Sequence, residues 1–248
     1  MCTLILAWRV FEDTPVAVAA NRDEADGRPA EPPQVWAGNS PQFVAPRDAE
    51  AGGTWVGYND VGLFVGITNR WENVDELASE RSRGLLVRDA LGRESAAAAL
   101  EYVESELTAR EYQPFHLVLA DAEAAYLLAW NGDLVVHELD PGLHVVVNVG
   151  FDGEYFVPDR RPDVGEQQAS DTDRVIGTIA PREDETAADW TARARDILGD
   201  HEYGRCIHGD GFGTKSSTAV RLERGGGHVE HAEGKPCETP FESIPTPF

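Results

Sequence analysis

The sequence predicts an α+β fold built mainly from antiparallel strands. Two apolar runs at residues 2–8 and 16–20, joined by a turn at 12–15, indicate an N-terminal hairpin. Four further apolar runs at 115–120, 124–130, 134–139 and 143–149 follow one another across tight turns, which indicates a meander. Between these groups the apolar period changes to that of helices. This order excludes a doubly wound parallel sheet as the simplest architecture.

The segment between the hairpin and the meander contains a loop, a second hairpin and two helices. Prolines within 26–33 predict a loop at the rim of a pocket, because the loop directly follows a polar cluster at 21–24. Residues 54–58 and 63–69 form a hairpin signal. Ser82 can cap a helix that ends at Gly92, and a second helix is expected from Ser95 to Leu107. These helices are expected to cover a sheet.

The last third of the chain is more polar. Residues 157–169 are charged and are expected to be irregular, with a short helix at 172–179 and a longer one at 187–198. A strand at 217–223 leads through the glycines at 225–227 into another hairpin strand. The tail at 236–248 shows no periodicity. With no internal repeat and no boundary, we expect a single domain over 1–248 with an irregular tail.

The amino-acid composition limits which classes of partner and which cellular compartment are expected. The 248 residues carry 44 acidic and 21 basic side chains, for a net charge of −23, and only Lys215 and Lys235 are lysines. Such acidity suits a halophilic source and argues against nucleic acid or anionic membranes as partners. Three cysteines cannot all pair, which favours free thiols. With no signal peptide and no membrane span apparent, a cytoplasmic protein is expected.

Cys2 is the first candidate catalytic residue, because its thiol can act as a nucleophile. If Met1 is removed, Cys2 carries both a thiol and an α-amine, and an α-amine with a pKa of about 7.7–8.0 can act as a base on that thiol. The hairpin would return the cluster Asn21, Arg22, Asp23 and Glu24 to the side of Cys2. The alternative is that Cys2 is an ordinary second residue of a buried strand.

Several short motifs occur in one order along the chain. They are Cys2-Thr3, the Asn-Arg-Asp-Glu of 21–24, the glycine-rich 52–57, the segments 66–70 and 82–87, and Phe212-Gly213-Thr214-Lys215-Ser216-Ser217-Thr218. Together they resemble the NRDE family, also called the transport-and-Golgi-organisation family, over roughly residues 1–222. The resemblance implies an N-terminal-nucleophile (Ntn) hydrolase-like architecture, a four-layer αββα sandwich of two antiparallel sheets between helix layers. That plan is similar to the penicillin V acylases and bile-salt hydrolases, which cleave amides outside peptides.

The resemblance and the chemistry of amide cleavage together suggest a site. Asp23 would orient the α-amine, and Asn69 with Asn148 would donate N–H groups to an oxyanion. Lys215 falls where the acylases have an arginine, and Arg22 is not a position-for-position match to theirs. The expected catalytic residues are Cys2, Arg22, Asp23, Asn69 and Asn148, and the expected substrate-binding residues are Asn21, Trp55, Arg70 and Lys215. The alternative is an ion-pair network at 22–24, with both catalytic asparagines serving as turn formers.

Two functions follow as hypotheses. The first is a cysteine amidohydrolase that acts on a small non-peptide amide. The second is a non-catalytic protein that binds or carries a hydrophobic ligand such as haem, and the resemblance implies this because a role in haem trafficking has been assigned to the family. Cys206 and His208, or His116 and His137, would be ligands of a generic type. The spacing of His201, Cys206 and His208 is not a standard zinc framework, so no metal and no cofactor are expected. The sequence leaves the oligomeric state open.

Overall fold

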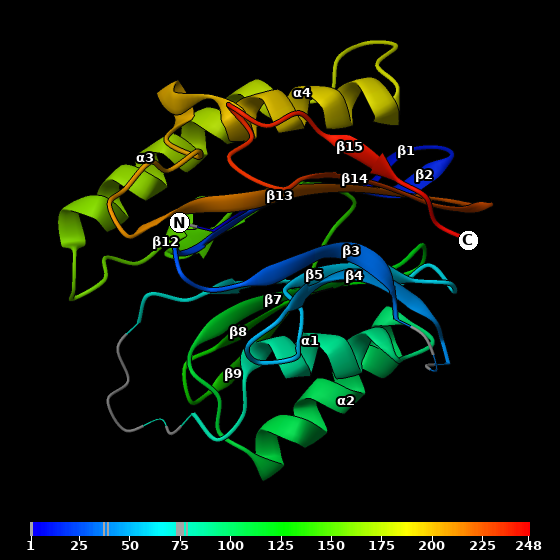
Figure 1. Ribbon diagram of the computed structural model, residues 1–248, viewed down its shortest axis with the longest axis horizontal. Helices are drawn as coiled ribbons and strands as arrows, with labels where there is room; N and C mark the ends of the chain where they lie inside the picture. The colour runs from blue at the N-terminus through cyan, green and yellow to red at the C-terminus, as the bar shows by residue number, and fades with distance from the viewer. Residues whose placement is uncertain (1, 37, 39, 73–76, 78) are drawn as a thin grey trace.

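Two antiparallel sheets lie face to face, and helices cover the outer face of each (Figure 1). The computed structural model describes residues 2–36, 38, 40–72, 77 and 79–248. Helices α3 (Pro162–Ile179) and α4 (Ala187–Gly199) cover one sheet, and α1 (Arg83–Leu91) and α2 (Ala96–Ala109) cover the other. The αββα sandwich expected from the resemblance is therefore confirmed.

The first sheet has eight strands within the described residues, in the order β12-β11-β10-β1-β2-β13-β14-β15. Its strands are β1 (Thr3–Phe11), β2 (Thr14–Ala25), β10 (Gly142–Val147), β11 (Gly150–Phe151), β12 (Glu154–Tyr155), β13 (Phe212–Glu223), β14 (Gly226–Ala232) and β15 (Glu242–Ile244). The N-terminal hairpin is confirmed, with Thr3 opposite Asn21. β2 lies in the middle because β13 pairs with its other edge from Phe212 opposite Ala25 to Leu222 opposite Val16.

The second sheet has seven strands within the described residues, in sequence order from β3 to β9. Its strands are β3 (Ala30–Trp36), β4 (Phe43–Asp48), β5 (Val56–Asn59), β6 (Phe64–Asn69), β7 (Phe115–Ala120), β8 (Ala125–Trp130) and β9 (Leu134–Glu138). The sheets pack closely, since a Cβ at Gly66 would lie 2.6 Å from a methyl carbon of Leu4 in the facing sheet.

The alternation of strand side chains fills three apolar layers. In β1, Leu4 and Leu6 face the second sheet, whereas Ile5 and Ala7 face α3 and α4. Because both faces of this strand are buried, its sequence is a nearly continuous apolar run. The third layer lies between the second sheet and helices α1 and α2.

Helix ends follow the capping residues. α1 (Arg83–Leu91) begins after Ser82, whose Oγ accepts a hydrogen bond from the Gly84 N–H at 3.2 Å. α2 (Ala96–Ala109) is capped in the same way by Ser95. The remaining helices are α3 (Pro162–Ile179), α4 (Ala187–Gly199) and the 3₁₀ helix η1 (His201–Tyr203). No helix among the described residues is both long and apolar enough to cross a lipid bilayer.

Four expectations from the sequence were wrong. The run at 143–149 does not continue the meander but enters the first sheet as β10, where it pairs with the free edge of β1. Residues 30–33, expected to end a loop, instead begin the edge strand β3, which has an irregular register between Glu31 and Gln34, where two prolines lack an N–H. Residues 162–179 form one helix. The tail includes strand β15, which pairs with β14.

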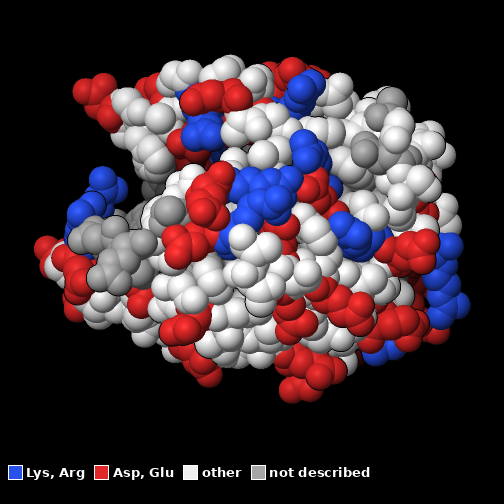
Figure 2. Space-filling view, turned by 90° about the horizontal axis from the view of Figure 1, so that it is seen from below, with Lys and Arg blue, Asp and Glu red and all other residues white. Residues whose placement is uncertain are grey.

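The surface charges are interleaved. Figure 2 views the side covered by α1 and α2, where basic side chains form separate clusters bordered by acidic ones. Just before α1, the Arg81 guanidinium lies 2.6 Å from the Asp89 carboxylate and 3.0 Å from that of Glu106. On this face the basic groups are neutralised locally, so the face presents no broad basic surface.

Candidate functional site

The N-terminal hairpin places Cys2 against the end of β2. Its Sγ donates a long hydrogen bond to the backbone oxygen of Asp23 at 3.8 Å. Both residues line a cavity of about 110 Å³, together with Arg22, Asn69 and Arg83. The structure therefore brings four of the five expected catalytic residues to one cavity.

Asp23 is held by strand β13. Thr214 lies opposite it in the ladder and donates its hydroxyl proton to Asp23 Oδ1 at 2.5 Å. The same hydroxyl oxygen accepts a hydrogen bond from the Ile207 N–H at 2.8 Å. The carboxylate is thus fixed by a partner whose own orientation is fixed.

Burial sets the protonation of the pair. Burial raises the pKa of the Asp23 carboxyl, although the hydrogen bond from Thr214 opposes this shift. Burial also raises the pKa of the Cys2 thiol, and the negative charge of Asp23 adds to the rise. The Cys2 thiol therefore keeps its proton at neutral pH until a base removes it.

Three arginines, Arg22, Arg28 and Arg83, line this cavity together with three acidic residues, Asp23, Glu24 and Asp48. The Arg22 guanidinium carbon lies 4.4 Å from the centroid of the Trp55 ring, and its nearest carboxylate, that of Glu24, is 3.8 Å away. Arg83 donates from Nη1 to the Pro114 carbonyl at 2.7 Å. Burial lowers the pKa of the Arg22 and Arg83 guanidinium groups, but arginine retains its charge at neutral pH.

The two expected oxyanion asparagines have different positions. Asn69 lines the Cys2 cavity, whereas Asn148 is not among the residues that line it. Asn148 Nδ2 donates to the backbone oxygen of Asn69 at 2.6 Å, and its Oδ1 accepts from Gln168 Nε2 at 3.2 Å. In this structure Asn148 holds the end of β6 in place.

The expected substrate-binding residues are spread over three places. Asn21 donates from Nδ2 to the carbonyls of Leu198 and Arg205, each at 3.0 Å, and so ties β2 to the helix layer. Arg70 pairs with Glu72 at 2.6 Å and lines a neighbouring cavity of about 300 Å³. Trp55 alone of the four lines the Cys2 cavity.

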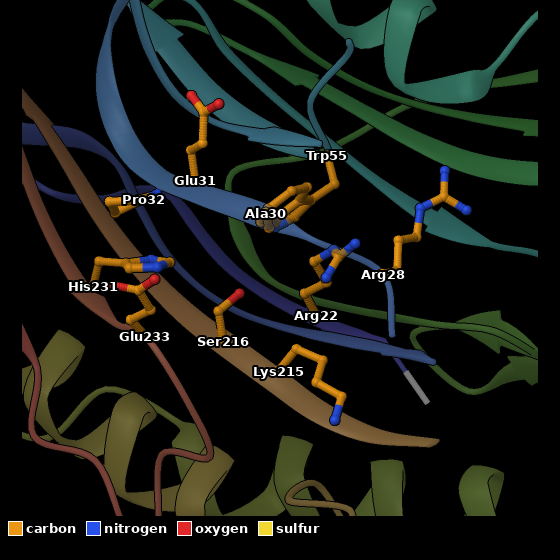
Figure 3. Close-up of a pocket in the computed structure, with 10 residues that line it drawn as sticks. All are labelled: Arg22, Arg28, Ala30, Glu31, Pro32, Trp55, Lys215, Ser216, His231 and Glu233. Carbon is orange, nitrogen blue, oxygen red and sulfur yellow. The ribbon is translucent and has the colours of Figure 1, made fainter. Parts of the chain in front are cut away.

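A second cavity adjoins that of Cys2 and contains Lys215. It has a volume of about 180 Å³ and shares Arg22, Arg28 and Trp55 with the first cavity (Figure 3). Lys215 lies on its wall and forms an ion pair with Asp26. The two cavities therefore meet at a wall of one aromatic ring and two guanidinium groups.

Sequence reasoning missed the contribution of the loops at 53–54 and 82–84. A Cβ at Gly53 would lie 2.2 Å from the Gly84 carbonyl carbon, so the two chains touch backbone to backbone. The Thr54 N–H donates to the Gly84 oxygen at 3.0 Å. This contact brings Arg83 to the cavity, and the glycines at 53 and 84 were its only signal in the sequence.

Arg205 was also missed, because it occurs in a polar segment without periodicity. Its side chain is fully buried, donates from Nε to the Tyr203 carbonyl at 2.7 Å, and lies 3.8 Å from the Asp171 carboxylate. It also contacts the hydroxyls of Thr3 and Thr172 at 3.3 and 3.4 Å. This guanidinium therefore anchors the start of β1 to α3.

The two histidines named as generic haem ligands share a different cavity. His116 and His137 line a space of about 310 Å³ together with Phe151 and Phe156. Burial lowers the pKa of His116 to about 3, so its imidazole is neutral. The other group, which includes Cys206 and His208, lies elsewhere and is described below.

Comparison with known proteins identifies relatives of the chain. The sequence profile of the family "Transport and Golgi organisation 2" matches residues 1–235. A mouse protein described as "Transport and Golgi organization 2 homolog" is 32% identical over 124 residues. That match spans 48% of this chain and 42% of the mouse protein, which is less than half of its length.

Two solved structures share the fold. Penicillin V acylase from Agrobacterium tumefaciens superposes with a TM-score of 0.54 at 13% identity, over 94% of this chain and 83% of the acylase. The Caenorhabditis elegans ortholog of N-acylethanolamine-hydrolyzing acid amidase superposes with a TM-score of 0.57 at 13% identity, over 88% and 92% of the two chains. The chain belongs to the Transport and Golgi organisation 2 family and has an Ntn-hydrolase-like fold.

Proposed function

We propose that the protein is a cysteine amidohydrolase that cleaves a small non-peptide amide through an acyl-enzyme on Cys2. One observation carries the proposal: the Cys2 sulfur lies 3.8 Å from the Asp23 backbone oxygen, in a cavity that also receives Asn69, Arg22 and Arg83. Amide cleavage requires a nucleophile, a group that orients its base and donors for an oxyanion, and these residues supply them.

The reaction proceeds in two steps after removal of Met1. The free α-amine of Cys2 takes the thiol proton, and the sulfur attacks the amide carbonyl carbon. The C–N bond then breaks, the proton passes to the leaving amine, and a thioester remains on Cys2. Water next attacks the thioester, releasing the carboxylic acid and restoring the thiol. Asp23 orients the α-amine, because its carboxylate is fixed by Thr214.

Asn69 is the proposed oxyanion donor, since this residue lines the cavity. Asn148 can serve as a second donor only if it leaves the Asn69 carbonyl, to which its Nδ2 is bonded at 2.6 Å. We therefore assign Asn148 the role of positioning Asn69. Asn148→Asp would remove the donated N–H while keeping the shape, and should lower kcat with little change in KM.

The charges of the lining balance, so the preference for an anionic group on the substrate rests on Arg22. Arg22 is a buried cation, and its Nη2 has no hydrogen-bond acceptor among the described residues. A carboxylate on the substrate would supply this acceptor through a charge-assisted hydrogen bond. The planar guanidinium of arginine matches a carboxylate better than the flexible ammonium of a lysine would. The Trp55 ring beside Arg22 provides the apolar contact for the rest of the molecule.

The test is kinetic and uses the mature chain. Intact mass should show loss of Met1, and the protein should hydrolyse N-acyl amino acids faster than the matching N-acyl amines that lack the carboxylate. Cys2→Ala should abolish turnover, and Arg22→Met should remove the preference for the carboxylate while leaving the thiol reactive toward iodoacetamide. Retention of Met1, or turnover that survives in Cys2→Ala, would overturn the mechanism.

A second candidate function is the binding of a hydrophobic ligand such as haem. It is supported by the cavity of about 310 Å³ in which two imidazoles and two phenyl rings lie together. Nδ1 of His116 is buried and has no hydrogen-bond partner among the described residues. Haem titration should give a saturable absorbance shift that is lost in His137→Gln. A titration without saturation would exclude this function.

A further inference from the structure

A cluster of two thiols and two imidazoles lies outside the Cys2 cavity. The Cys206 and Cys237 sulfurs are 3.3 Å apart, and His208 Nε2 lies 3.6 Å from the first and 3.1 Å from the second. The His201 ring packs edge-on against His208 with a centroid distance of 4.8 Å. Ligand atoms of His201, His208 and Cys237 all lie within 4.8 Å of one another.

Two segments that are distant in sequence form this cluster: residues 201–208 carry His201, Cys206 and His208, and residues 235–238 carry Cys237. η1 presents His201 and ends at Gly204, which has a φ of 61°. The chain between β14 and β15 passes beside the end of α4 (Figure 1), where a Cβ at Gly199 would lie 3.3 Å from the Pro236 carbonyl. A turn in which the Lys235 carbonyl accepts from the Glu238 N–H at 2.9 Å then presents Cys237. The two segments thus bring His201, His208 and Cys237 together, and Cys206 joins them through its contacts with His208 and Cys237.

We propose that Cys206, Cys237, His201 and His208 bind a divalent metal ion of the zinc class. A tetrahedral zinc ion has bonds of about 2.3 Å to sulfur and 2.0–2.1 Å to nitrogen, so its ligand atoms lie roughly 3.3–3.8 Å apart. The three distances among Cys206, Cys237 and His208 lie close to this range. On binding, each thiol loses its proton to solvent and bonds to the metal as a thiolate.

A carboxylate behind His208 supports the assignment. His208 directs Nε2 at the sulfurs, whereas its Nδ1 lies 3.7 Å from Glu238 Oε1. Histidines that bind metals commonly turn their second ring nitrogen toward a carboxylate, which sets the tautomer and raises the basicity of the ligating nitrogen. A disulfide between the two cysteines would give neither imidazole nor this carboxylate a role.

The site would fasten the segment that holds Asp23. Ile207 stands between the ligands Cys206 and His208, and its N–H donates to the same Thr214 hydroxyl that donates to Asp23. A metal ion would therefore pin the C-terminal turn to the start of β13, beside the Cys2 cavity. The sequence obscured this site because Cys237 follows His208 only after 28 intervening residues.

The experiment measures metal on the full-length chain, independently of any activity. The reduced protein is freed of metal with a chelator and titrated with Co²⁺, for which a thiolate-bearing tetrahedral site gives intense visible ligand-field bands and a near-ultraviolet charge-transfer band. Saturation is expected at one equivalent, and Zn²⁺ should displace the cobalt. Cys237→Ser and His208→Gln should lose these bands, and both residues are exposed enough to be changed without disturbing a core.

Two controls and a graded variant sharpen the test. Cys2→Ser and His228→Gln each remove one residue of a ligand type outside the cluster, and should retain full cobalt binding. Glu238→Gln should weaken binding by about tenfold through the Nδ1 contact. Absence of the cobalt bands, their persistence in Cys237→Ser, or a metal-free native chain lighter by two hydrogens because Cys206 and Cys237 form a disulfide, would each overturn the proposal.

Discussion

Thr214→Val tests how Asp23 is held, since valine keeps the shape of threonine and removes only the hydroxyl. The variant loses a buried hydrogen bond of 2.5 Å to Asp23 and leaves the Ile207 N–H without its acceptor at 2.8 Å. A hydrogen bond to an ionisable group contributes about 1.5–3 kcal/mol, and an unsatisfied buried donor costs about 1–3 kcal/mol. We therefore expect the free energy of unfolding to fall by about 3 kcal/mol.

The assay is urea unfolding at neutral pH, with Thr214→Ser as the matched variant that keeps the hydroxyl. Serine should recover most of the loss. Thr218→Val, on the same strand, removes a hydroxyl that contacts His231 at 3.0 Å and not Asp23, so it should leave the reactivity of Cys2 toward iodoacetamide unchanged. If Thr214→Val were as stable as the wild type, the account of how Asp23 is fixed would be refuted.

Three further predictions concern stability. Burial lowers the pKa of His231 to about 4, below its unfolded value of about 6.5, so the unfolded chain binds the proton first as pH falls. Stability should therefore decrease from pH 6.5 to 4 by up to about 3 kcal/mol, and His231→Gln should flatten this part of the stability curve. Gly53→Ala should lower stability by about 1–3 kcal/mol in urea unfolding, because its Cβ would overlap the Gly84 backbone, and an unchanged midpoint would contradict that contact. Gly177→Ala, at a position within α3 where the added carbon would meet no atom within 4 Å beyond its chain neighbours and the helix's own backbone, should raise the melting temperature through a gain of about 1 kcal/mol.

Local patterns predicted the elements whose burial is regular. Strand β1 alternates Leu4 and Leu6 toward one layer with Ile5 toward the other, and Ser82 caps the helix that ends before Gly92. The N-terminal hairpin followed from these patterns and placed Cys2 beside Asp23 correctly. Periodicity is informative there because the neighbouring layers are apolar.

Helix α3 shows why other parts could not be predicted. Its buried face includes Gln168, Asp171 and Thr172. The side chains of Asp171 and Thr172 and the backbone oxygen of Gln168 face the buried Arg205 guanidinium. A helix that packs against a buried guanidinium has polar residues on its buried face and therefore lacks a continuous apolar stripe. For this reason the hydropathy of residues 157–169 indicated an irregular segment. The same limit applies to Arg83, since the loop contact that brings it to the cavity joins residues distant in sequence.

The position of β2 inside the first sheet gives Asp23 and Cys2 different backbone mobility. β2 is paired along both edges, with β1 and with β13, so its amide protons should exchange with solvent only in the largest cooperative opening of the molecule. Cys2 precedes the first paired residue of β1, Thr3. Chemical changes ahead of Cys2 therefore leave the ladder intact, and the strand that carries Asp23 remains a fixed reference against which the sulfur is presented.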